Sequence, residues 1–405
     1  MNILILSPGY PAEMPQFTRG LAEVGANVYG VGDQHPGALP ESVQRNLSGY
    51  LPVRSLWDED AVVAAVRAWP EARRLDGVEC LWEPGMLLAA RIREALGLPG
   101  LRVAETVPFR DKEAMKQVLD RARLRTPRHV RCASASACWE AAERIGYPLI
   151  IKPIAGAGSA DTYRVESMED LRSVLPRLQH VPEVSVEEFV EGDEFTFDTV
   201  TIRGKIAYYN IAWYRPRPLV ARSNEWISPQ VIALRHVDQA TLAEGVKLGR
   251  AVIQALGFQS GFTHMEWYRK ADGEVVFGEI GARPPGAHQV DQMNFACEFD
   301  VYREWGRAVA FGRFDAEIKR NYNVSNIYKR AQGQGQIARI AGLDRIERLY
   351  GDHIVWNNLL PVGAPRRNWR NTLVSDGFLM VRHPELATLV RISDDIGENL
   401  HLHAE

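Results

Sequence analysis

Two glutamates near the middle of the chain are predicted to face each other across a β-hairpin. Residues 261–283 read GFTHMEWYRKADGEVVFGEIGAR, which is two strand-like runs separated by Asp272 and Gly273. An Asp-Gly pair between such runs predicts a two-residue turn. With that turn, Glu266 lies opposite Glu279, with the two Cβ atoms about 5 Å apart. Arg283 follows Glu279 in the sequence, just beyond the second predicted strand.

Like charges at this distance destabilise a sheet unless something neutralises them. A hard divalent cation such as Mg²⁺ (or Mn²⁺) takes oxygen ligands and would neutralise the two carboxylates. The alternative is that both carboxylates point to solvent, and a longer turn would change the pairing. The hairpin by itself leaves these alternatives open.

A second segment has the composition of a phosphate-binding loop. Residues 150–163 read IIKPIAGAGSADTY, so that Lys152 ends a strand and small residues follow it. Backbone N–H groups of such a loop reach phosphate oxygens, and the ammonium neutralises their charge. The lysine precedes the glycines, unlike the order in the P-loop. The alternative is that Gly156 and Gly158 simply make a hairpin turn.

A third segment, residues 186–194, reads VEEFVEGDE. Its extended backbone could pair with the edge of an adenine, and a carboxylate beyond the turn, such as Glu194, could accept hydrogen bonds from ribose hydroxyls. Taken alone, the segment is equally an acidic surface strand.

The elements that must position these side chains belong to more than one lobe, because 405 residues exceed a single core. The first hundred residues alternate strands and helices, which predicts a parallel sheet with helical crossovers. No Gly-x-Gly-x-x-Gly follows the first strand, so a dinucleotide site is not expected there. Beyond about residue 315, short strands and Gly/Pro turns predict a further lobe.

Composition excludes several classes of protein. The net charge of −3 gives no electrostatic footprint for nucleic acid or an anionic membrane. No apolar run approaches the roughly 20 residues that span a bilayer. The four cysteines are scattered, and the N-terminus lacks the features of a signal peptide, so a reduced, cytoplasmic setting is expected.

The order of these motifs resembles that of the ATP-grasp superfamily, over about residues 105–312. The branch that it resembles most includes carbamoyl-phosphate synthetase-like proteins and amino-acid ligases. The resemblance implies an α/β fold: an ATP-grasp fold preceded by a Rossmann-like pre-ATP-grasp domain and followed by a C-terminal α+β lobe. The expected domains are residues 1–105, 106–185 (small ATP-grasp subdomain), 186–315 (large subdomain) and 316–405. The motifs that carry the resemblance are Asp111-Lys112, 150–153 with its small-residue loop, 187–192 with Glu194, Glu266, and 279–283.

The resemblance also implies a nucleotide site. Lys112 and Lys152 would meet the ATP phosphates, and the loop 155–161 would close over them. Lys116 is expected on the solvated surface. Within the loop and the acidic strand, the matching positions are Gly156, Gly158 and Ser159, then Glu187 near the adenine amino group, the Phe189 and Val190 backbone as hinge contacts, and Glu194 at the ribose.

At the hairpin, the resemblance assigns Glu266 and Glu279 as metal ligands and Arg283 as the group that steadies the transferred phosphate. A guanidinium fork suits the charge that accumulates on phosphoryl oxygens. The alternative for Arg283 is a salt bridge to one of the same glutamates. Many relatives carry an asparagine two residues after the second glutamate. This chain has Gly281 there, which leaves the number of metal ions open.

Candidates for substrate contacts are Arg215, His264 and His288. Arg215 lies in Trp213-Tyr214-Arg215-Pro216-Arg217-Pro218, where rigid prolines flank arginines suited to a carboxylate. The alternative is an exposed basic loop. His264 shares the hairpin face of Glu266, and a turn could carry His288 into an acceptor pocket. A structural role is equally open for both histidines.

The expected function is ATP-dependent ligation of a small-molecule carboxylate to an amine through an acyl-phosphate, with ADP and phosphate released. One alternative is bicarbonate phosphorylation, as in carboxylases and carbamoyl-phosphate-type enzymes. Another is an ATP-binding regulatory module without turnover. Gly281 favours this alternative, and five residues disfavour it: Lys112, Lys152, Glu266, Glu279 and Arg283. The resemblance makes a homodimer the expected oligomer.

Overall fold

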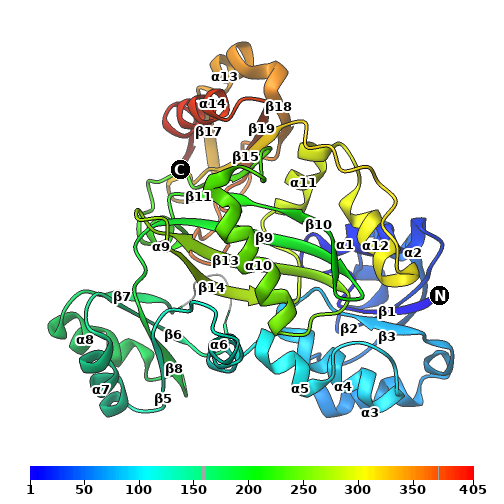
Figure 1. The fold of residues 1–405 in the computed structure, drawn as a ribbon. Coiled ribbons are helices and arrows are strands. Elements are labelled where there is room, and N and C mark those ends of the chain that lie inside the picture. The colour runs from blue at the N-terminus through cyan, green and yellow to red at the C-terminus, as the bar shows by residue number, and fades with distance from the viewer. Residues whose placement is uncertain (157–160, 373) are drawn as a thin grey trace.

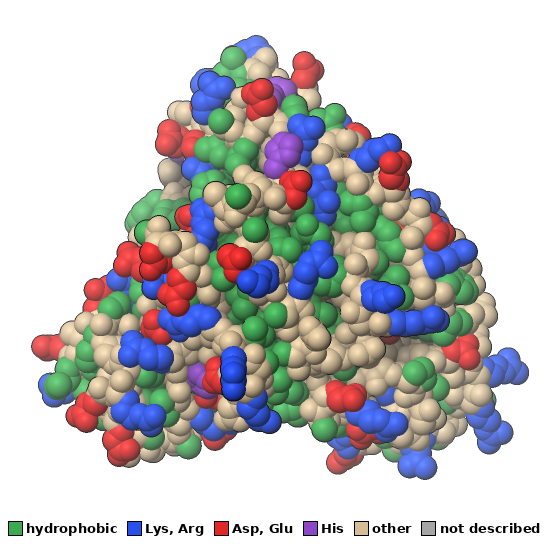
Figure 2. Space-filling view, in the orientation of Figure 1, with side chains coloured by type: hydrophobic (Ala, Val, Ile, Leu, Met, Phe, Trp, Pro, Cys, Tyr) green, Lys and Arg blue, Asp and Glu red, His purple; other side chains and the backbone are tan. Residues whose placement is uncertain are grey.

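The computed structural model describes residues 1–156, 161–372 and 374–405. Figure 1 shows three groups of elements: the N-terminal strands and helices at lower right, a small sheet with two helices at lower left, and a large central sheet that continues to the C-terminal helices at the top. Within the described ranges, no helix is long and apolar enough to cross a membrane. Figure 2 shows basic and acidic side chains interspersed over one face, in keeping with the small net charge.

The N-terminal lobe is a four-stranded parallel sheet with the strand order β3-β2-β1-β4. The predicted alternation of strands and helices is confirmed, and β3 and α3 complete it. The apolar first strand is buried because helices cover the sheet. The elements are β1 (Asn2–Leu6), α1 (Met14–Glu23), β2 (Asn27–Gly32), α2 (Glu41–Asn46), β3 (Leu47–Pro52), α3 (Glu59–Ala68), β4 (Gly77–Glu79), α4 (Met86–Leu96) and α5 (Val103–Thr106), with 3₁₀ turns at Pro36–Ala38, Pro70–Arg74, Glu83–Gly85 and Val107–Phe109.

A second, antiparallel sheet has the order β5-β8-β6-β7 and carries two helices. It is preceded by α6 (Lys112–Arg121), which begins at Lys112 because the Asp111 carboxylate accepts hydrogen bonds from Glu113 N–H and Ala114 N–H. Lys112 N–H in turn donates to Ile154 O, which joins the start of α6 to the end of β6. The sheet contains β5 (His129–Cys132), α7 (Ala135–Ile145), β6 (Leu149–Pro153), β7 (Tyr163–Val165), α8 (Met168–Val174), a 3₁₀ turn at Leu175–Leu178 and β8 (Val184–Glu188).

The central sheet has the order β14-β13-β9-β11-β12-β15-β19-β18, with β10 paired to β9. It passes through the boundary predicted at residue 315, because β12 pairs with β15. The C-terminal lobe therefore shares its main sheet with the large ATP-grasp subdomain predicted before it. The domain limits given from the sequence remain predictions. Its elements are β9 (Asp193–Ile202), β10 (Lys205–Asn210), β11 (Ala212–Arg215), α9 (Pro218–Ser223), β12 (Gln230–Ala233), α10 (Ala243–Ala255), β13 (Gly261–Arg269), β14 (Val275–Gly281), α11 (Gln289–Cys297), α12 (Val301–Phe311), β15 (Asn323–Tyr328), α13 (Leu343–Tyr350), β18 (Ile354–Asn357), β19 (Phe378–His383) and α14 (Leu386–Asn399), with 3₁₀ turns at Ala240–Leu242 and Gly351–His353 and a small sheet of β16 (Gln332–Gly333), β17 (Ile337–Ala341) and β20 (His401–Ala404).

Helices α1 and α12 fasten the N-terminal lobe to the central sheet. They approach closely at two glycines: a Cβ on Gly20 would lie 2.4 Å from Tyr302 O, and one on Gly306 would lie 2.9 Å from Gly20 O. Beside this contact, Phe17 packs edge-on against Tyr302 and Trp305. All three rings are fully buried, so this contact forms part of the largest core of the molecule.

Candidate active site

The hairpin of β13 and β14 places the two predicted carboxylates opposite each other, as expected. Glu266 pairs with Glu279 and His264 with Gly281. The predicted two-residue turn is wrong, however. Lys270 N–H donates to Glu274 O, so residues 271–273 form a three-residue loop, in which Gly273 adopts φ +89°.

A bulge corrects the register that the longer loop shifts. From the loop up to Trp267 and Phe277 the pairing is displaced by one residue, and at Glu266 it returns to the predicted register. Gly278 is the extra residue. A Cβ there would lie 2.9 Å from Glu266 O, so the strands can approach this closely because the residue is glycine.

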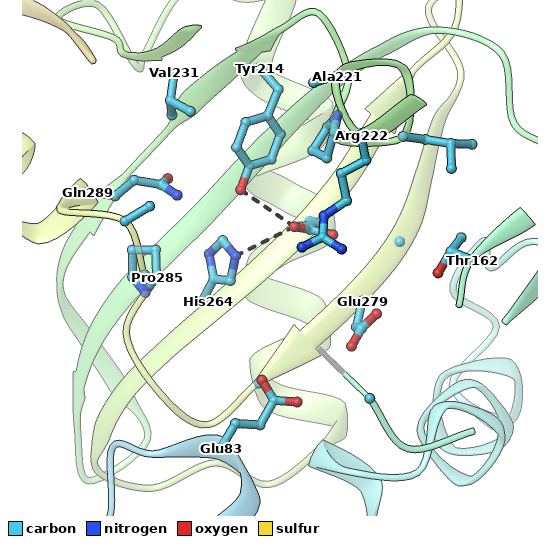
Figure 3. Close-up of a pocket in the computed structure, with 18 of the residues that line it drawn as sticks. Glu83, Thr162, Tyr214, Ala221, Arg222, Val231, His264, Glu279, Pro285 and Gln289 are labelled. Atoms are coloured by element: carbon cyan, nitrogen blue, oxygen red, sulfur yellow. Dashed lines mark hydrogen bonds and ion pairs between the residues drawn. The ribbon is translucent and has the colours of Figure 1, made fainter. Parts of the chain in front are cut away.

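These carboxylates line a cavity of about 660 Å³ between the lobes. Figure 3 shows Glu83 and Glu279 on one side of it and Tyr214, Arg222 and Val231 on the other. Two of the predicted loop residues, Gly158 and Ser159, lie outside the described residues. The predicted residues that line the cavity are Lys112, Lys152, Gly156, Glu187, Phe189, Val190, Glu194, His264, Glu266, Glu279 and Arg283.

The two predicted phosphate lysines enter the cavity beside carboxylates. Lys112 Nζ lies 3.1 Å from Glu279 Oε1 and donates to Gly156 O at 2.9 Å. Lys152 Nζ lies 3.0 Å from Glu187 Oε2. Burial acts to lower the pKa of Lys152, but the negative charges of Glu187 and Glu279 outweigh it and raise that pKa. Lys152 is therefore held as a cation on the cavity wall.

Lys116 is not on the surface, as the sequence suggested, but is 1% exposed. Its Nζ donates to Glu187 Oε1 at 2.5 Å and to Lys112 O at 3.3 Å. Glu187 is thus held between two lysines. Burial alone would raise the pKa of its carboxyl group, but Lys116 and Lys152 lower it far below its ordinary value.

The predicted adenine segment borders the same cavity. Phe189 N–H donates to Pro148 O, and Val190 O accepts from Arg217 Nη1 at 2.7 Å. Within the described residues, Phe189 C=O and Val190 N–H have no hydrogen-bond partner. A base edge with one donor and one acceptor would fit these two groups.

Glu194 lies deeper in the cavity, beside Arg217, whose Nε is 3.1 Å from Glu194 Oε2. The Glu194 side chain is buried, and burial, followed by repulsion from Glu266, raises the pKa of its carboxyl group to about 7. A hydroxyl-bearing ligand would find an acceptor here, in line with the predicted ribose role.

Glu266 is linked to a buried histidine. His264 Nε2 lies 3.6 Å from Glu266 Oε1, and His264 Nδ1 lies 2.6 Å from Asp198 Oδ1. Burial would lower the pKa of His264, but hydrogen bonds to Asp198 and Glu266 raise it to about 9. The histidine therefore lies in the cavity wall as a cation between two carboxylates, and Tyr214 Oη donates to the same oxygen of Glu266 at 3.5 Å.

The paired glutamates suit a cation that completes its coordination from a phosphate-bearing ligand. Among the described residues, no group of three or more His, Cys, Asp or Glu side chains could hold a metal ion. Mg²⁺ is commonly held by one or two carboxylates together with substrate phosphates and water. At Gly281 a Cβ would lie 3.2 Å from Arg283 Cγ, because the arginine side chain lies over that position.

Arg283 is paired with a residue that the sequence did not single out. Its Nε lies 2.6 Å from Glu83 Oε2, and Arg110 contacts the other oxygen of the same carboxylate. Burial would raise the pKa of Glu83, but Arg283 and Arg110 lower it. Glu83 follows β4, so an acidic residue beyond a parallel strand end was the available signal. The N-terminal lobe thereby holds Arg283 in place.

Two predicted substrate residues, Arg215 and His288, do not line the cavity, so the prediction that they contact the substrate is wrong for this cavity. Arg215 bonds to Asp394 at 3.0 Å and Gln230 at 2.7 Å, and it does not line the cavity. His288 bonds to Asp291 at 2.9 Å and packs against Trp356 and Phe378, also outside the cavity lining. Their interactions are those of structural side chains. From the segment around Arg215, the arginines that line the cavity are Arg217 and Arg222.

Comparison with curated proteins finds ligases. The chain is 26% identical over 218 residues to an L-arginine-specific L-amino acid ligase from Bacillus subtilis, covering 52% of each protein. It is 36% identical over 109 residues to a D-alanine–D-alanine ligase from Clostridium perfringens, covering 26% of this chain and 36% of that ligase. The chain thus matches about half of the length of the first relative and about a third of the second.

Solved structures share the whole fold. An L-amino acid ligase from Bacillus licheniformis superposes with a TM-score of 0.81 at 22% identity, covering 100% of this chain and 98% of that one. An N5-carboxyaminoimidazole ribonucleotide synthetase from Thermotoga maritima gives 0.72 at 16% identity, covering 100% and 99%.

Family models match on both sides of the cavity: the ATP-grasp N-terminal domain over residues 23–100 and the ATP-grasp domain over residues 117–292. Together with the shared fold and the motif order, these matches identify the chain as a member of the ATP-grasp superfamily.

Proposed function

We propose that the protein is an ATP-dependent carboxylate–amine ligase, an enzyme that forms an amide bond and releases ADP and phosphate. One observation carries the proposal: a single cavity joins two lysines, a facing pair of glutamates and an arginine that the N-terminal lobe holds. The similarity to amino acid ligases supports it.

In this proposal ATP lies between the two sheets, with its base at Phe189 and Val190, its ribose at Glu194 and its phosphates at Lys112 and Lys152. Each group borders the same cavity. Glu187 would act through the lysines that it contacts, beside the base. The lysines place fixed positive charge where phosphate oxygens collect, which is the main requirement of phosphoryl transfer.

The first step is attack of a substrate carboxylate oxygen on the γ-phosphorus, which forms an acyl-phosphate and breaks the bond to ADP. Arg283 faces the transferred group, and its pairing with Glu83 fixes its orientation before substrate arrives. Glu266 and Glu279 would hold Mg²⁺ or Mn²⁺, which neutralises phosphate charge when bound.

In the second step an amine nitrogen attacks the acyl carbon, phosphate leaves with the anhydride oxygen, and the nitrogen loses a proton. Both substrates would lie beside Arg283 in the one cavity, so that the amine is positioned next to the acyl-phosphate when it forms. Positioning and charge neutralisation by these side chains supply the catalysis.

The experiment is ADP release from Mg²⁺-ATP across a panel of amino acids and other carboxylates, singly and in pairs, with mass spectrometry of the products. We expect release that requires both a carboxylate and an amine, with an amide as product. Release with bicarbonate alone would instead establish the carboxylase-type alternative. ATP binding without ADP release across the whole panel would overturn the ligase proposal in favour of a regulatory module.

A further inference from the structure

The arginines that line the cavity divide into two kinds. Arg217 and Arg283 each have a carboxylate within 3.1 Å, from Glu194 and Glu83. Arg222 and Arg330 line the same cavity, but among the described residues neither has an ion-pair partner. The second pair therefore brings positive charge to the cavity that side chains in contact with it do not neutralise.

Arg330 is held rigidly without being neutralised. Its Nη1 donates to Ala221 O at 2.8 Å and to Asn224 O at 2.7 Å, and its guanidinium lies 4.4 Å from the centre of the Trp369 ring. Two carbonyls and an aromatic face fix its plane but carry no full negative charge. In the described part of the chain, Nη2 of Arg330 has no hydrogen-bond partner, which leaves a donor for a ligand.

Arg222 lies next in the chain to Ala221, the residue that Arg330 holds. Figure 3 shows its guanidinium reaching into the pocket from α9. Within the described ranges, the Arg222 side chain makes one long hydrogen bond, of 3.4 Å to Arg370 O. The geometry thus gives two guanidinium groups on one wall of the cavity, both with donors to spare.

The nearest acids are engaged elsewhere. Glu225 pairs with Arg366, and Asp376 accepts from Ala331 N–H at 2.8 Å and from Arg367 N–H at 2.7 Å. Burial lowers the pKa of Arg330 to about 10, because it outweighs the opposing effect of Glu225; the smaller effects of Arg222 and Asp376 lower and raise that pKa, respectively. An anionic group from outside the chain would relieve this uncompensated charge.

We propose that Arg222 and Arg330 bind the free carboxylate of the amine-bearing substrate, so that the acceptor is an amino acid and not a simple amine. This inference rests on the proposed ligase function. The carboxylate that is phosphorylated must lie at Arg283 and the lysines. A carboxylate at Arg222 and Arg330 is a different one, and two guanidinium forks hold it in a fixed orientation. Binding there directs the acceptor amine to the acyl-phosphate and keeps the acceptor carboxylate from being phosphorylated.

The test uses the donor and acceptor pair that gives the most ADP in the panel, and compares the acceptor amino acid with its carboxamide. In the wild-type protein we expect kcat/KM for the acid to exceed that for the amide by about tenfold or more, the scale of a charge-assisted hydrogen bond. Arg222→Gln and Arg330→Gln should each raise KM for the acid by about tenfold. The acid and the amide should then be used nearly equally. KM for ATP and for the donor should stay within about twofold of wild type.

Arg370→Gln is the matched control, because this arginine also lies over the Trp369 ring but is exposed and does not line the cavity. It should leave all KM values unchanged. Arg330 also holds the C-terminal end of α9 through Ala221 and Asn224, so Arg222→Gln, which disrupts fewer contacts, keeps the test decisive if Arg330→Gln misfolds. A wild-type enzyme that uses acid and amide equally, or variants that raise KM for the donor instead, would overturn the inference while leaving the ligase intact. An absence of ADP release with every pair would remove the ligase function itself.

Discussion

A substitution at Glu279 tests whether the two facing carboxylates form a metal site. The Glu279→Gln substitution keeps the shape of the side chain and removes one of two facing negative charges. We expect ADP release to be abolished, while the free energy of unfolding changes by less than about 1 kcal/mol, because the Glu279 side chain is partly exposed and the loss of its ion pair with Lys112 is offset by the removal of one of two facing negative charges. Steady-state ADP release and urea unfolding measure the two effects.

Glu274→Gln is the control for this substitution. Glu274 lies just before the same strand and pairs with Lys270 and Arg125, outside the cavity lining. Its variant should retain activity. Full activity in Glu279→Gln would show that the carboxylate pair is not the metal site.

At this scale, the sequence predicted the residues that belong to local motifs and missed those that depend on tertiary contacts. Lys112 and Lys152 were found because each has a fixed place at the start of a helix or the end of a strand. Glu83 was missed because its partner lies 200 residues away. Arg215 lies outside the cavity because alternate residues of a strand face opposite sides, and on β11 its neighbour Tyr214 is the residue that lines the cavity.

The bulge at Gly278 is the element on which the carboxylate pairing depends. In Gly278→Ala the new methyl group would press against Glu266 O, so the strand must shift. We expect the free energy of unfolding to fall by about 1–3 kcal/mol, and ADP release per folded molecule to fall as well. Gly273→Ala is the comparison: nothing lies within 4 Å of its Cβ, but its φ of +89° strains the loop. It should lose stability and keep its activity per folded molecule, and equal loss of activity in both variants would argue against the bulge.

A buried lysine, Lys329, binds a carbonyl group near the C-terminal end of α14. Its burial predicts that the free energy of unfolding depends on pH. Lys329 Nζ donates to Gly397 O at 2.7 Å and Ser228 Oγ at 2.8 Å, and burial lowers the pKa of Lys329 to about 8. The unfolded chain then binds more protons than the folded chain between about pH 8 and 10.5. The free energy of unfolding should therefore rise through that window, by on the order of 3 kcal/mol relative to a Lys329→Met variant. Parallel pH profiles of the two proteins in urea unfolding would contradict this.

The hairpin also shows how a correct pairing can follow from a wrong turn. An Asp-Gly dipeptide is compatible with two-residue and three-residue loops, and the sequence alone does not separate them. The Gly at 278 was a visible sign of a bulge, since glycine within a strand often marks one. Because loop and bulge each add one residue, the two departures cancel at Glu266 and Glu279.

The contact between α1 and α12 determines how the lobes are arranged. It joins the lobe that carries Glu83 to the sheet that carries Arg283. Gly20→Ala would place a methyl group 2.4 Å from Tyr302 O. We expect a loss of about 1–3 kcal/mol in the free energy of unfolding, together with a lower kcat. Gly397→Ala is the control, since this glycine lies in α14 with no atom closer than 3.5 Å to its Cβ. A stable Gly20→Ala protein would mean that the helices separate without cost.

The architecture of the lobes was predictable from the alternation of strands and helices and from motif order. The way in which the lobes are joined was not predictable. The central sheet continues through β15, past the boundary predicted at residue 315. Chain position does not reveal which edge of a sheet a later strand will extend.

The bond between Glu83 and Arg283 limits how such proteins can be recombined. A chimera that keeps residues 106–405 and takes its first hundred residues from a relative would leave Arg283 without its counter-charge, unless the graft also brings an acid just beyond its last parallel strand. A buried cation without that acid would turn towards Glu266 or Glu279 and compete with whatever they hold. The N-terminal lobe and the rest of the chain are therefore not freely interchangeable, even where their folds match those of a relative. A working chimera must exchange Glu83 and Arg283 together.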